Sequence, residues 1–171
     1  STGMATMDEV ELSFKVLIEN GLKKNMITVL HCNTEYPTPY EDVNLLAMKT
    51  LSKKLQVAVG YSDHSLGSEV AIASVALGAA VIEKHFTLDQ NLLGPDHKAS
   101  MNPKEFHEYT KILKKTYIMM GSGKKIPQKC EIKNMKIARK SLVASKTILK
   151  GEIFTKDNIA VKRPAGGLSP M

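Results

Sequence analysis

The sequence predicts an α/β fold built on a parallel sheet, followed by a small β-rich module. Three short apolar segments, at residues 26–32, 56–60 and 80–85, have the length and composition of strands buried on both faces. Segments with helical spacing of apolar residues separate them, which predicts right-handed crossovers between parallel strands. After the Gly-Ser-Gly sequence at 121–123, this alternation stops.

The predicted helices begin at capping signals. Thr6 and Glu9 form a capping box, in which each side chain accepts a hydrogen bond from the other residue's backbone N–H. Thr38 and Glu41 predict a second capping box, with proline at the first helical position. Two further helices are predicted at 68–77 and 102–120.

The change of pattern near residue 121 predicts two domains. We expect a first domain at 1–121, a linker at 122–137 and a second domain at 138–171. In the second domain, strands are predicted at 140–145 and 158–163, with a turn at 149–152 between them. Since the chain stops soon afterwards, this module is expected to be truncated or very small.

Two architectures fit the predicted parallel strands, a doubly wound open sheet and a (β/α)8 barrel. Only three clear strands are present, with residues 1–3 as the exit of a fourth. A barrel needs roughly 250 residues, so about half of a barrel would be absent. The first residues contain neither an initiator methionine nor a signal peptide, so we expect the chain to begin inside a longer protein.

Composition argues against two classes of function. The formal net charge is +7, but nearly all basic residues are lysines spread along the chain, and the arginines are Arg139 and Arg163. A nucleic-acid binder usually concentrates arginine and aromatic residues, so we expect no nucleic-acid partner. No apolar run reaches the ~20 residues of a membrane helix. Two cysteines make no disulfide framework, which favours a reducing, cytoplasmic location.

Polar residues follow the second and third predicted strands. Because residues two apart on a strand share a face, Ser62 would point with His64, and Glu83 with His85. Chemistry in such folds gathers at the carboxyl ends of the strands. Two imidazoles on adjacent strands can share a divalent transition metal, with oxygen donors and water completing the shell. Ordinary hydrogen bonding by both histidines remains an open alternative.

Two loops also carry clusters of polar residues. Residues 31–37 follow the first strand and suggest a binding loop, although a capped turn into the next helix would have a similar composition. Residues 93–100 follow the third strand and contain Asp, His and Lys after a Gly-Pro turn. Their position favours a loop that faces a substrate over a simple solvated loop.

Taken together and in order, the motifs at 31–42, 60–64, 83–87 and 94–100 resemble those of sialic acid synthases. Residues 162–164 resemble part of the C-terminal SAF, or antifreeze-like, domain of that family. The resemblance covers the whole chain. It implies the C-terminal half of a (β/α)8 TIM barrel, followed by a truncated small β-rich SAF domain.

The resemblance also assigns roles to single residues. His64 and His85 would bind a divalent metal, usually Mn²⁺. Ser62 would lie near the phosphate of phosphoenolpyruvate, with Ser1 as a second contact. Glu83 and Asp96 would be the catalytic carboxylates that handle protons.

Other matched positions would contact the sugar. Tyr36, Glu83 and Asp96 match positions that line the sugar pocket or the metal shell. Many family members read Thr-Asn where this chain reads Asn33-Thr34, so either Thr34 or its neighbour would be the polar contact. Arg163 matches an arginine that the SAF domain of one subunit contributes to the partner's site in a domain-swapped homodimer.

The implied activity is that of a nonulosonic acid synthase. Such an enzyme condenses phosphoenolpyruvate with N-acetylmannosamine or a related N-acyl amino sugar and releases phosphate. We expect the chain by itself to be an incomplete, inactive fragment; the alternative is a non-catalytic half-barrel that binds metal or sugar. With inward sheet faces lined by residues such as Val29, Val59 and Ile82, it is expected to fold stably only with the missing half.

Overall fold

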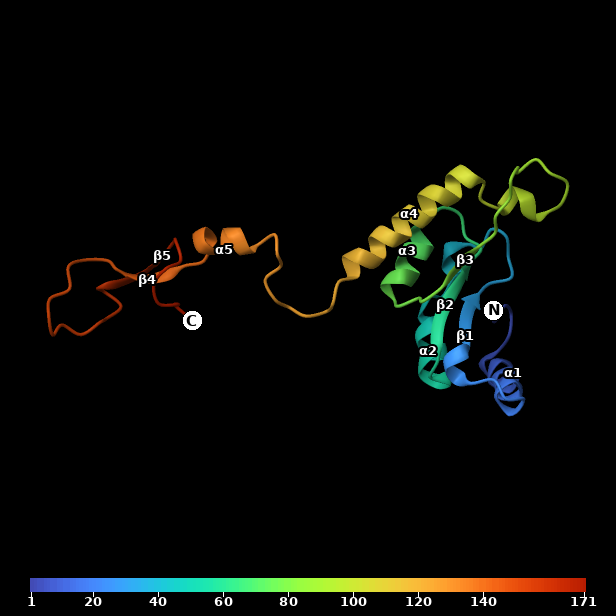
Figure 1. Cartoon of the computed structure of the whole chain (residues 1–171), viewed down its shortest axis with the longest axis horizontal. Coiled ribbons are helices and arrows are strands. Elements are labelled where there is room, and N and C mark those ends of the chain that lie inside the picture. Colours follow the sequence, from blue (N-terminus) through green and yellow to red (C-terminus); the bar gives the residue numbers. More distant parts are fainter. The chain divides into compact units, whose positions relative to one another are not determined.

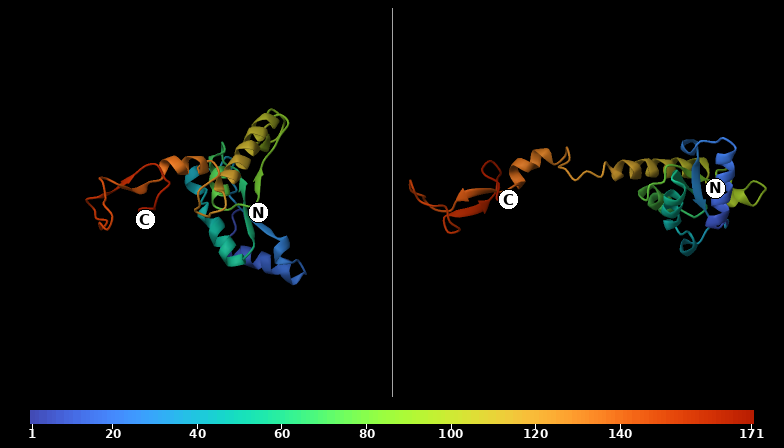
Figure 2. Two further views of the ribbon diagram at one scale, coloured as in Figure 1. Left: turned by 60° about the vertical axis from the view of Figure 1, so that its left-hand side comes forward. Right: turned by 90° about the horizontal axis from the view of Figure 1, so that it is seen from below.

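The computed structural model describes all 171 residues and divides into two compact units, Ser1–Ser122 and Gly123–Met171. The first unit contains three strands, which lie side by side with helices flanking them (Figures 1 and 2). The strands are β1 (Thr28–Cys32), β2 (Ala58–Asp63) and β3 (Ile82–Lys84). The helices are α1 (Met7–Glu19), α2 (Leu46–Leu55), α3 (Glu69–Ala76) and α4 (Pro103–Met120). Single 3-10 turns are η1 (Lys24–Met26), η2 (Tyr40–Asp42) and η3 (Asp96–Ala99).

The sheet is parallel, in the order β1-β2-β3, as the alternation of helices and strands predicts. Strand β2 continues to Asp63, beyond the predicted end at residue 60, and its last residues pair with β3. In this register Ser62 lies opposite Glu83. The ends of β2 and β3 that carry the candidate site are therefore aligned with each other.

The two faces of the sheet have different neighbours. Val59 and Tyr61 belong to one buried cluster with Met48 and Leu51 of α2, and Val29 and Ile82 pack against this cluster. The expectation that Val29, Val59 and Ile82 line the inward face is therefore wrong. Since side chains alternate along a strand, the opposite face of β2 carries Gly60 and Ser62.

Gly60 allows a close approach between neighbouring chain segments. A Cβ atom at this position would lie 2.3 Å from the carbonyl oxygen of Val81 and 2.4 Å from Cδ2 of Leu30. The backbone N–H of the next residue, Tyr61, donates a 2.9 Å hydrogen bond to that same carbonyl. Only glycine fits where β2 is held this tightly between its neighbours.

The helix starts follow the predicted signals in two cases. Reciprocal capping boxes form at Thr6 with Glu9 and at Asn102 with Glu105. The capping box predicted at Thr38 is wrong: the backbone N–H of Thr38 donates to the carbonyl of His64, and its hydroxyl donates to the carbonyl of Glu35. Thr38 caps no helix: the single turn η2 follows at Tyr40, without a side-chain cap, and α2 begins at Leu46.

The second unit is a small module of its own. Strands β4 (Ser141–Ala144) and β5 (Ile159–Lys162) pair antiparallel, as two strands of a ribbon (Figure 2). Helix α5 (Ile132–Ala138) precedes them and falls mostly inside the stretch predicted as a linker at 122–137. The Arg139 N–H caps the end of α5 through a bond to Met135. This helix is short and was not predicted.

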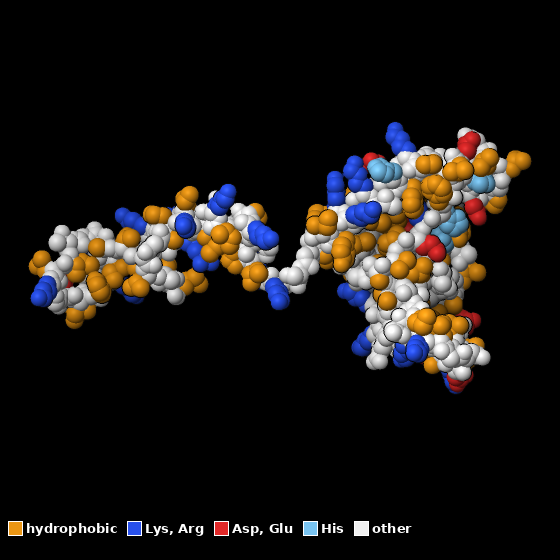
Figure 3. Space-filling view, viewed as in Figure 1, with side chains coloured by type: hydrophobic (Ala, Val, Ile, Leu, Met, Phe, Trp, Pro, Cys, Tyr) orange, Lys and Arg blue, Asp and Glu red, His pale blue; other side chains and the backbone are white.

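The exposed surface includes several large apolar side chains. Tyr117, Ile118 and Met119 are about three-quarters exposed at the end of α4, where hydrophobic side chains gather in Figure 3. Even so, no helix in the structure combines the length and apolar character that crossing a membrane requires.

Candidate functional site

The candidate site lies at the carboxyl ends of β2 and β3. The buried Ser62 hydroxyl donates a 2.7 Å hydrogen bond to Oε1 of Glu83 on the neighbouring strand. The same hydroxyl oxygen lies 3.3 Å from Nε2 of His64. Ser62 therefore links a carboxylate on one strand to an imidazole on the other.

The two histidines lie together as the sheet register implies. Extending the pairing of β2 and β3 by one residue places His64 opposite His85. Their ring centroids are 5.1 Å apart, with the planes 87° apart. The Tyr36 ring adjoins both, at 4.1 Å from the His64 ring and 5.0 Å from the His85 ring. The three rings form one cluster at the strand ends.

Hydrogen bonding orients the His64 ring. Nδ1 lies 2.5 Å from the carbonyl oxygen of Asn33, an atom that only accepts hydrogen bonds. Nδ1 therefore donates to this carbonyl, and Nε2 faces the hydroxyl oxygen of Ser62. A backbone carbonyl that fixes the tautomer of a histidine in this way is the usual partner of a metal-bound imidazole.

The chain offers only part of a ligand set for a metal at this site. No group of three or more His, Cys, Asp or Glu side chains in the chain could hold an ion. The pair His64 and His85 would thus supply two nitrogen ligands, and oxygen atoms from water or substrate would supply the others.

Tyr36 stands beside the carboxylates of the site. Partial burial raises the pKa of the Tyr36 phenol, and electrostatic interactions with Cys32, Asp96 and Glu83 raise it further. Asp96 begins the exposed turn η3 and contributes to this shift. Contacts place Tyr36 against both histidine rings, and Glu83 beside Ser62.

The loop that carries Asp96 is tied down on both sides. Oγ1 of the buried Thr87 lies 2.7 Å from Nδ1 of His97, and the hydroxyl of Ser100 donates a 2.7 Å hydrogen bond to the carbonyl of Asp96. The side chain of Gln90 donates to the carbonyl of Ser100. These bonds hold a loop with few apolar contacts in a defined conformation.

Ser1 and Thr34 lie near the first strand. The backbone N–H of Thr2 donates a 2.9 Å hydrogen bond to the carbonyl of Leu30, so the first residues run beside β1. The Thr34 hydroxyl is 3.3 Å from the position that a Cβ of Gly3 would occupy. Ser1 and Thr34 are both exposed, and no hydrogen bond joins either one to Ser62.

Arg163 belongs to the second unit. Its Nε donates a 2.7 Å hydrogen bond to the carbonyl of Ala138 at the end of α5, and the guanidinium is otherwise exposed. Its expected approach to the site of a partner subunit remains a prediction.

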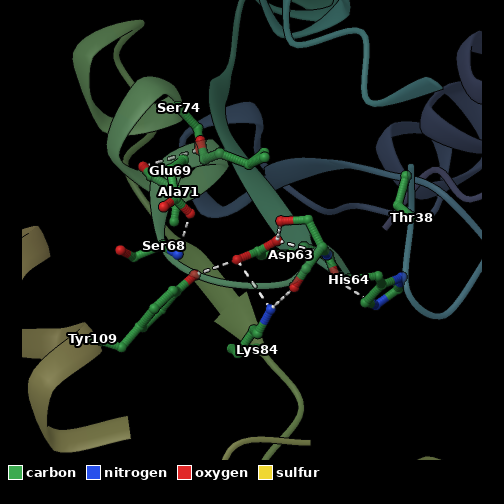
Figure 4. A network of polar contacts seen from close by, with 12 residues as sticks. Thr38, Asp63, His64, Ser68, Glu69, Ala71, Ser74, Lys84 and Tyr109 are labelled. Carbon is green, nitrogen blue, oxygen red and sulfur yellow. Dashed lines mark hydrogen bonds and ion pairs between the residues drawn. The ribbon is translucent and has the colours of Figure 1, made fainter. Parts of the chain in front are cut away.

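Sequence reasoning missed a buried polar cluster behind the site. Asp63, Lys84 and Tyr109 contact one another on the opposite side of the strand ends from the histidines (Figure 4). A usable signal was present, since two opposite charges, Asp63 and Lys84, interrupt two buried strands at aligned positions. The reasoning also missed Asn33 as the carbonyl that orients His64.

Comparisons with known proteins fit this arrangement. Residues 1–125 match the model of the NeuB family, and residues 139–171 match the model of the SAF domain. Over its whole length, the chain is 53% identical to the N,N'-diacetyllegionaminic acid synthase of Campylobacter jejuni, and the match covers 51% of that protein. Over 99% of its length, it is 40% identical to the protein of the same name from Legionella pneumophila, and the match covers 48% of that protein.

A solved structure agrees with the fold. The N-acetylneuraminic acid synthetase of Leptospira borgpetersenii, crystallised with citrate, superposes with a TM-score of 0.68 at 36% identity, over 78% of this chain and 46% of that one. The chain spans about half the length of the curated relatives it matches. Its three parallel strands and their helices are therefore part of a sialic acid synthase-type (β/α)8 barrel, joined to an SAF domain. The family match, which covers 125 of the 171 residues, shows that the chain belongs to the NeuB family.

Proposed function

We propose that this chain supplies the metal-binding half of the active site of a nonulosonic acid synthase. The reaction would join phosphoenolpyruvate to N-acetylmannosamine or a related N-acyl amino sugar and release phosphate. The observation that carries the proposal is the alignment of His64 with His85, beside the hydrogen-bonded pair Ser62 and Glu83, in a chain of the NeuB family.

His64 and His85 are proposed as the ligands of a divalent ion, with Mn²⁺ as the best candidate. When bound, the ion would act as a Lewis acid toward the carbonyl oxygen of the open-chain sugar. The chain itself prepares the ligands: the carbonyl of Asn33 fixes the tautomer of His64, and Tyr36 covers one side of both rings.

Ser62 and Glu83 are proposed to work beside the histidines. Ser62 can donate to a phosphate oxygen of phosphoenolpyruvate once its hydroxyl leaves Glu83. Glu83 is exposed at the strand end and can accept or return a proton at the reacting atoms, as can Asp96 on its loop.

Two further candidates would recognise the sugar. Thr34 and Tyr36 lie on the loop after β1 and present a hydroxyl and a phenol to solvent. We assign Arg163 to the site of a partner subunit in a domain-swapped homodimer, and Ser1 to the phosphoenolpyruvate phosphate.

Both Cys32 and Cys130 are free, which is compatible with the proposed cytoplasmic location.

The proposed reaction consumes one phosphoenolpyruvate, one sugar and one water. C3 of phosphoenolpyruvate attacks the aldehyde carbon of the open-chain sugar and forms the new carbon–carbon bond. Water adds to C2, and inorganic phosphate leaves with cleavage of the C2–oxygen bond. The proton lost by water can pass to a carboxylate such as Glu83 or Asp96, and the sugar oxygen gains one.

The relatives are about twice as long as this chain. The test therefore uses the complete synthase, meaning this chain assembled with the N-terminal barrel half that the family resemblance implies. Phosphate release from phosphoenolpyruvate is measured with and without N-acetylmannosamine. We expect release that depends on the sugar, and little release from the chain alone. Binding of metal or sugar without any release by the complete synthase would favour a non-catalytic binding module.

The same assay addresses the choice of sugar. Relatives from two organisms are named N,N'-diacetyllegionaminic acid synthases, a name that implies a product with two acetyl groups on nitrogen. We propose that the preferred substrate is an amino sugar with two acetamido groups. A higher kcat/KM for such a sugar than for N-acetylmannosamine would support this choice, and the reverse order would reject it.

A further inference from the structure

Asp63 and Lys84 form a buried ion pair behind the histidine-bearing strand ends. Nζ of Lys84 lies 3.2 Å from Oδ2 of Asp63, and the two side chains are 3% and 0% exposed. They come from aligned positions on β2 and β3. A buried charge is costly unless it is paired and fully hydrogen-bonded, so the surroundings of this pair matter.

Those surroundings satisfy both charges. The Tyr109 hydroxyl of α4 donates a 2.7 Å hydrogen bond to Oδ2 of Asp63. Oδ1 accepts from the backbone N–H of Ser65 at 2.9 Å and from its hydroxyl at 2.6 Å, and Lys84 donates to the carbonyl of Ser65. Figure 4 shows Tyr109 and Lys84 converging on Asp63, while the ring of His64 points away from them.

The cluster holds the backbone on both sides of His64. Asp63, a member of the cluster, precedes this histidine. Ser65, which is bonded to Asp63 and Lys84, follows it. On the other strand, Lys84 directly precedes His85. Since neighbouring side chains on a strand point to opposite faces, the cluster and the two imidazoles lie on opposite sides of the same short backbone segments. The ion pair therefore ties together the two segments that carry the rings.

We propose that Asp63, Lys84 and Tyr109 are positioning residues that set the separation and orientation of His64 and His85, and with them the affinity for a divalent ion. This inference rests on the proposed function of the histidines. The cluster touches neither ring and acts only through the backbone. Helix α4, through Tyr109, thereby becomes part of the support of the metal site, although it lies behind the sheet.

A role in stability alone does not account for the cluster. Well-packed apolar residues of similar volume often replace a buried ion pair with no loss of stability. What apolar residues cannot replace is the geometry: an ion pair, a tyrosine hydrogen bond and three bonds to Ser65 that fix one register at the strand ends. Metal sites need such fixed geometry, because displaced supporting groups weaken binding.

The test measures Mn²⁺ affinity by titration calorimetry on the complete synthase without substrates, together with thermal unfolding. Lys84→Met keeps the length of the side chain and removes the charge, and Tyr109→Phe removes one hydroxyl. Ser74→Ala is the matched control: Ser74 is fully buried on α3 and bonds only to carbonyls of its own helix. We expect Kd for Mn²⁺ to rise about 10-fold or more in Lys84→Met and less in Tyr109→Phe. It should stay within about twofold in Ser74→Ala, even where the melting temperature falls.

The outcomes separate this inference from the proposed function. If the wild-type protein binds Mn²⁺ and both Lys84→Met and Tyr109→Phe bind it equally well, the positioning role is overturned while the metal site stands. If the wild-type protein binds no Mn²⁺, both ideas fail. Should Lys84→Met not fold, Tyr109→Phe decides alone: an unchanged Kd would overturn the inference, and a raised Kd with the control unchanged would support it.

Discussion

Ser62 and Glu83 share a 2.7 Å hydrogen bond across directly paired positions of β2 and β3. The hydroxyl also lies 3.3 Å from Nε2 of His64, so it stands between the carboxylate and the histidine. Such a group can exchange a partner within the protein for one on a substrate without being left unpaired. This is the basis of the first prediction.

Ser62→Ala is expected to lower kcat/KM of the complete synthase for phosphoenolpyruvate. Losing a hydrogen bond to a charged group costs about 1.5–3 kcal/mol, which corresponds to roughly a 10- to 150-fold decrease. Initial rates of phosphate release at varied phosphoenolpyruvate concentration measure the effect. Ser74→Ala, which removes a buried hydroxyl that bonds only to carbonyls of α3, serves as the control. A loss no larger than that of the control would show that Ser62 makes no contact with the substrate.

Local patterns in the sequence were enough to predict much of this site. The period of two along a strand placed Ser62 with His64, and Glu83 with His85, and the structure brings these four residues together. The capping box of α1 was equally local, since Thr6 and Glu9 complete it within one turn. These features depend on residues only a few positions apart.

The features that the sequence did not reveal depend on distant partners. Tyr109 reaches Asp63 across 46 positions of the chain. Thr38 looked like a helix cap, but the carbonyl of His64, 26 positions away, takes its backbone N–H. A tertiary hydrogen bond therefore took the place of the capping box that the local sequence predicted. A single sequence does not show which distant groups will meet.

Gly60→Ala is expected to destabilise the first unit strongly. The new Cβ would meet a backbone carbonyl at 2.3 Å, and the backbone of a central strand has little freedom to move. We expect a loss above about 3 kcal/mol, the upper end for overpacked cores. Urea unfolding followed by circular dichroism measures it.

The matched control for this variant is Gly78→Ala. Gly78 has a φ of +99° and no atom within 4 Å of an added Cβ, so it tests backbone strain without a clash. A cost of about 1–2 kcal/mol is expected there. Equal losses in the two variants would contradict a steric role for Gly60.

Alkaline pH should destabilise the protein through two buried tyrosines. Burial, followed by the charge of Asp63, raises the pKa of both Tyr61 and Tyr109. Above about pH 10 the unfolded chain releases these protons while the folded chain keeps them, so the free energy of unfolding falls as pH rises. In Tyr109→Phe the decline should be shallower by about 1.4 kcal/mol per pH unit.

Urea unfolding of the wild type and of Tyr109→Phe, at intervals between about pH 8 and about pH 11, provides this comparison. Tyr117→Phe is a suitable control because Tyr117 lies on the same helix and is largely exposed. Parallel pH profiles for the wild type and Tyr109→Phe would contradict the buried, protonated state of Tyr109.

The partner-subunit role of Arg163 can be tested by mixing inactive variants. Arg163→Ala and His64→Ala are each expected to inactivate the complete synthase. If each site combines His64 of one subunit with the arginine of the other, a mixed dimer contains one intact site, and activity returns after subunit exchange. If both residues of a site come from one subunit, the mixture stays inactive, which would reject the swapped arrangement.

The most direct test of the account is Mn²⁺ binding by the complete synthase in three variants. We predict one bound ion per chain in the wild type, and loss of binding in both His64→Ala and His85→Ala. His107→Ala, which removes an exposed imidazole on α4, should bind as the wild type does. Retained, full-affinity binding in either His64→Ala or His85→Ala, or no binding in the wild type, would contradict the assignment of this histidine pair as the metal site.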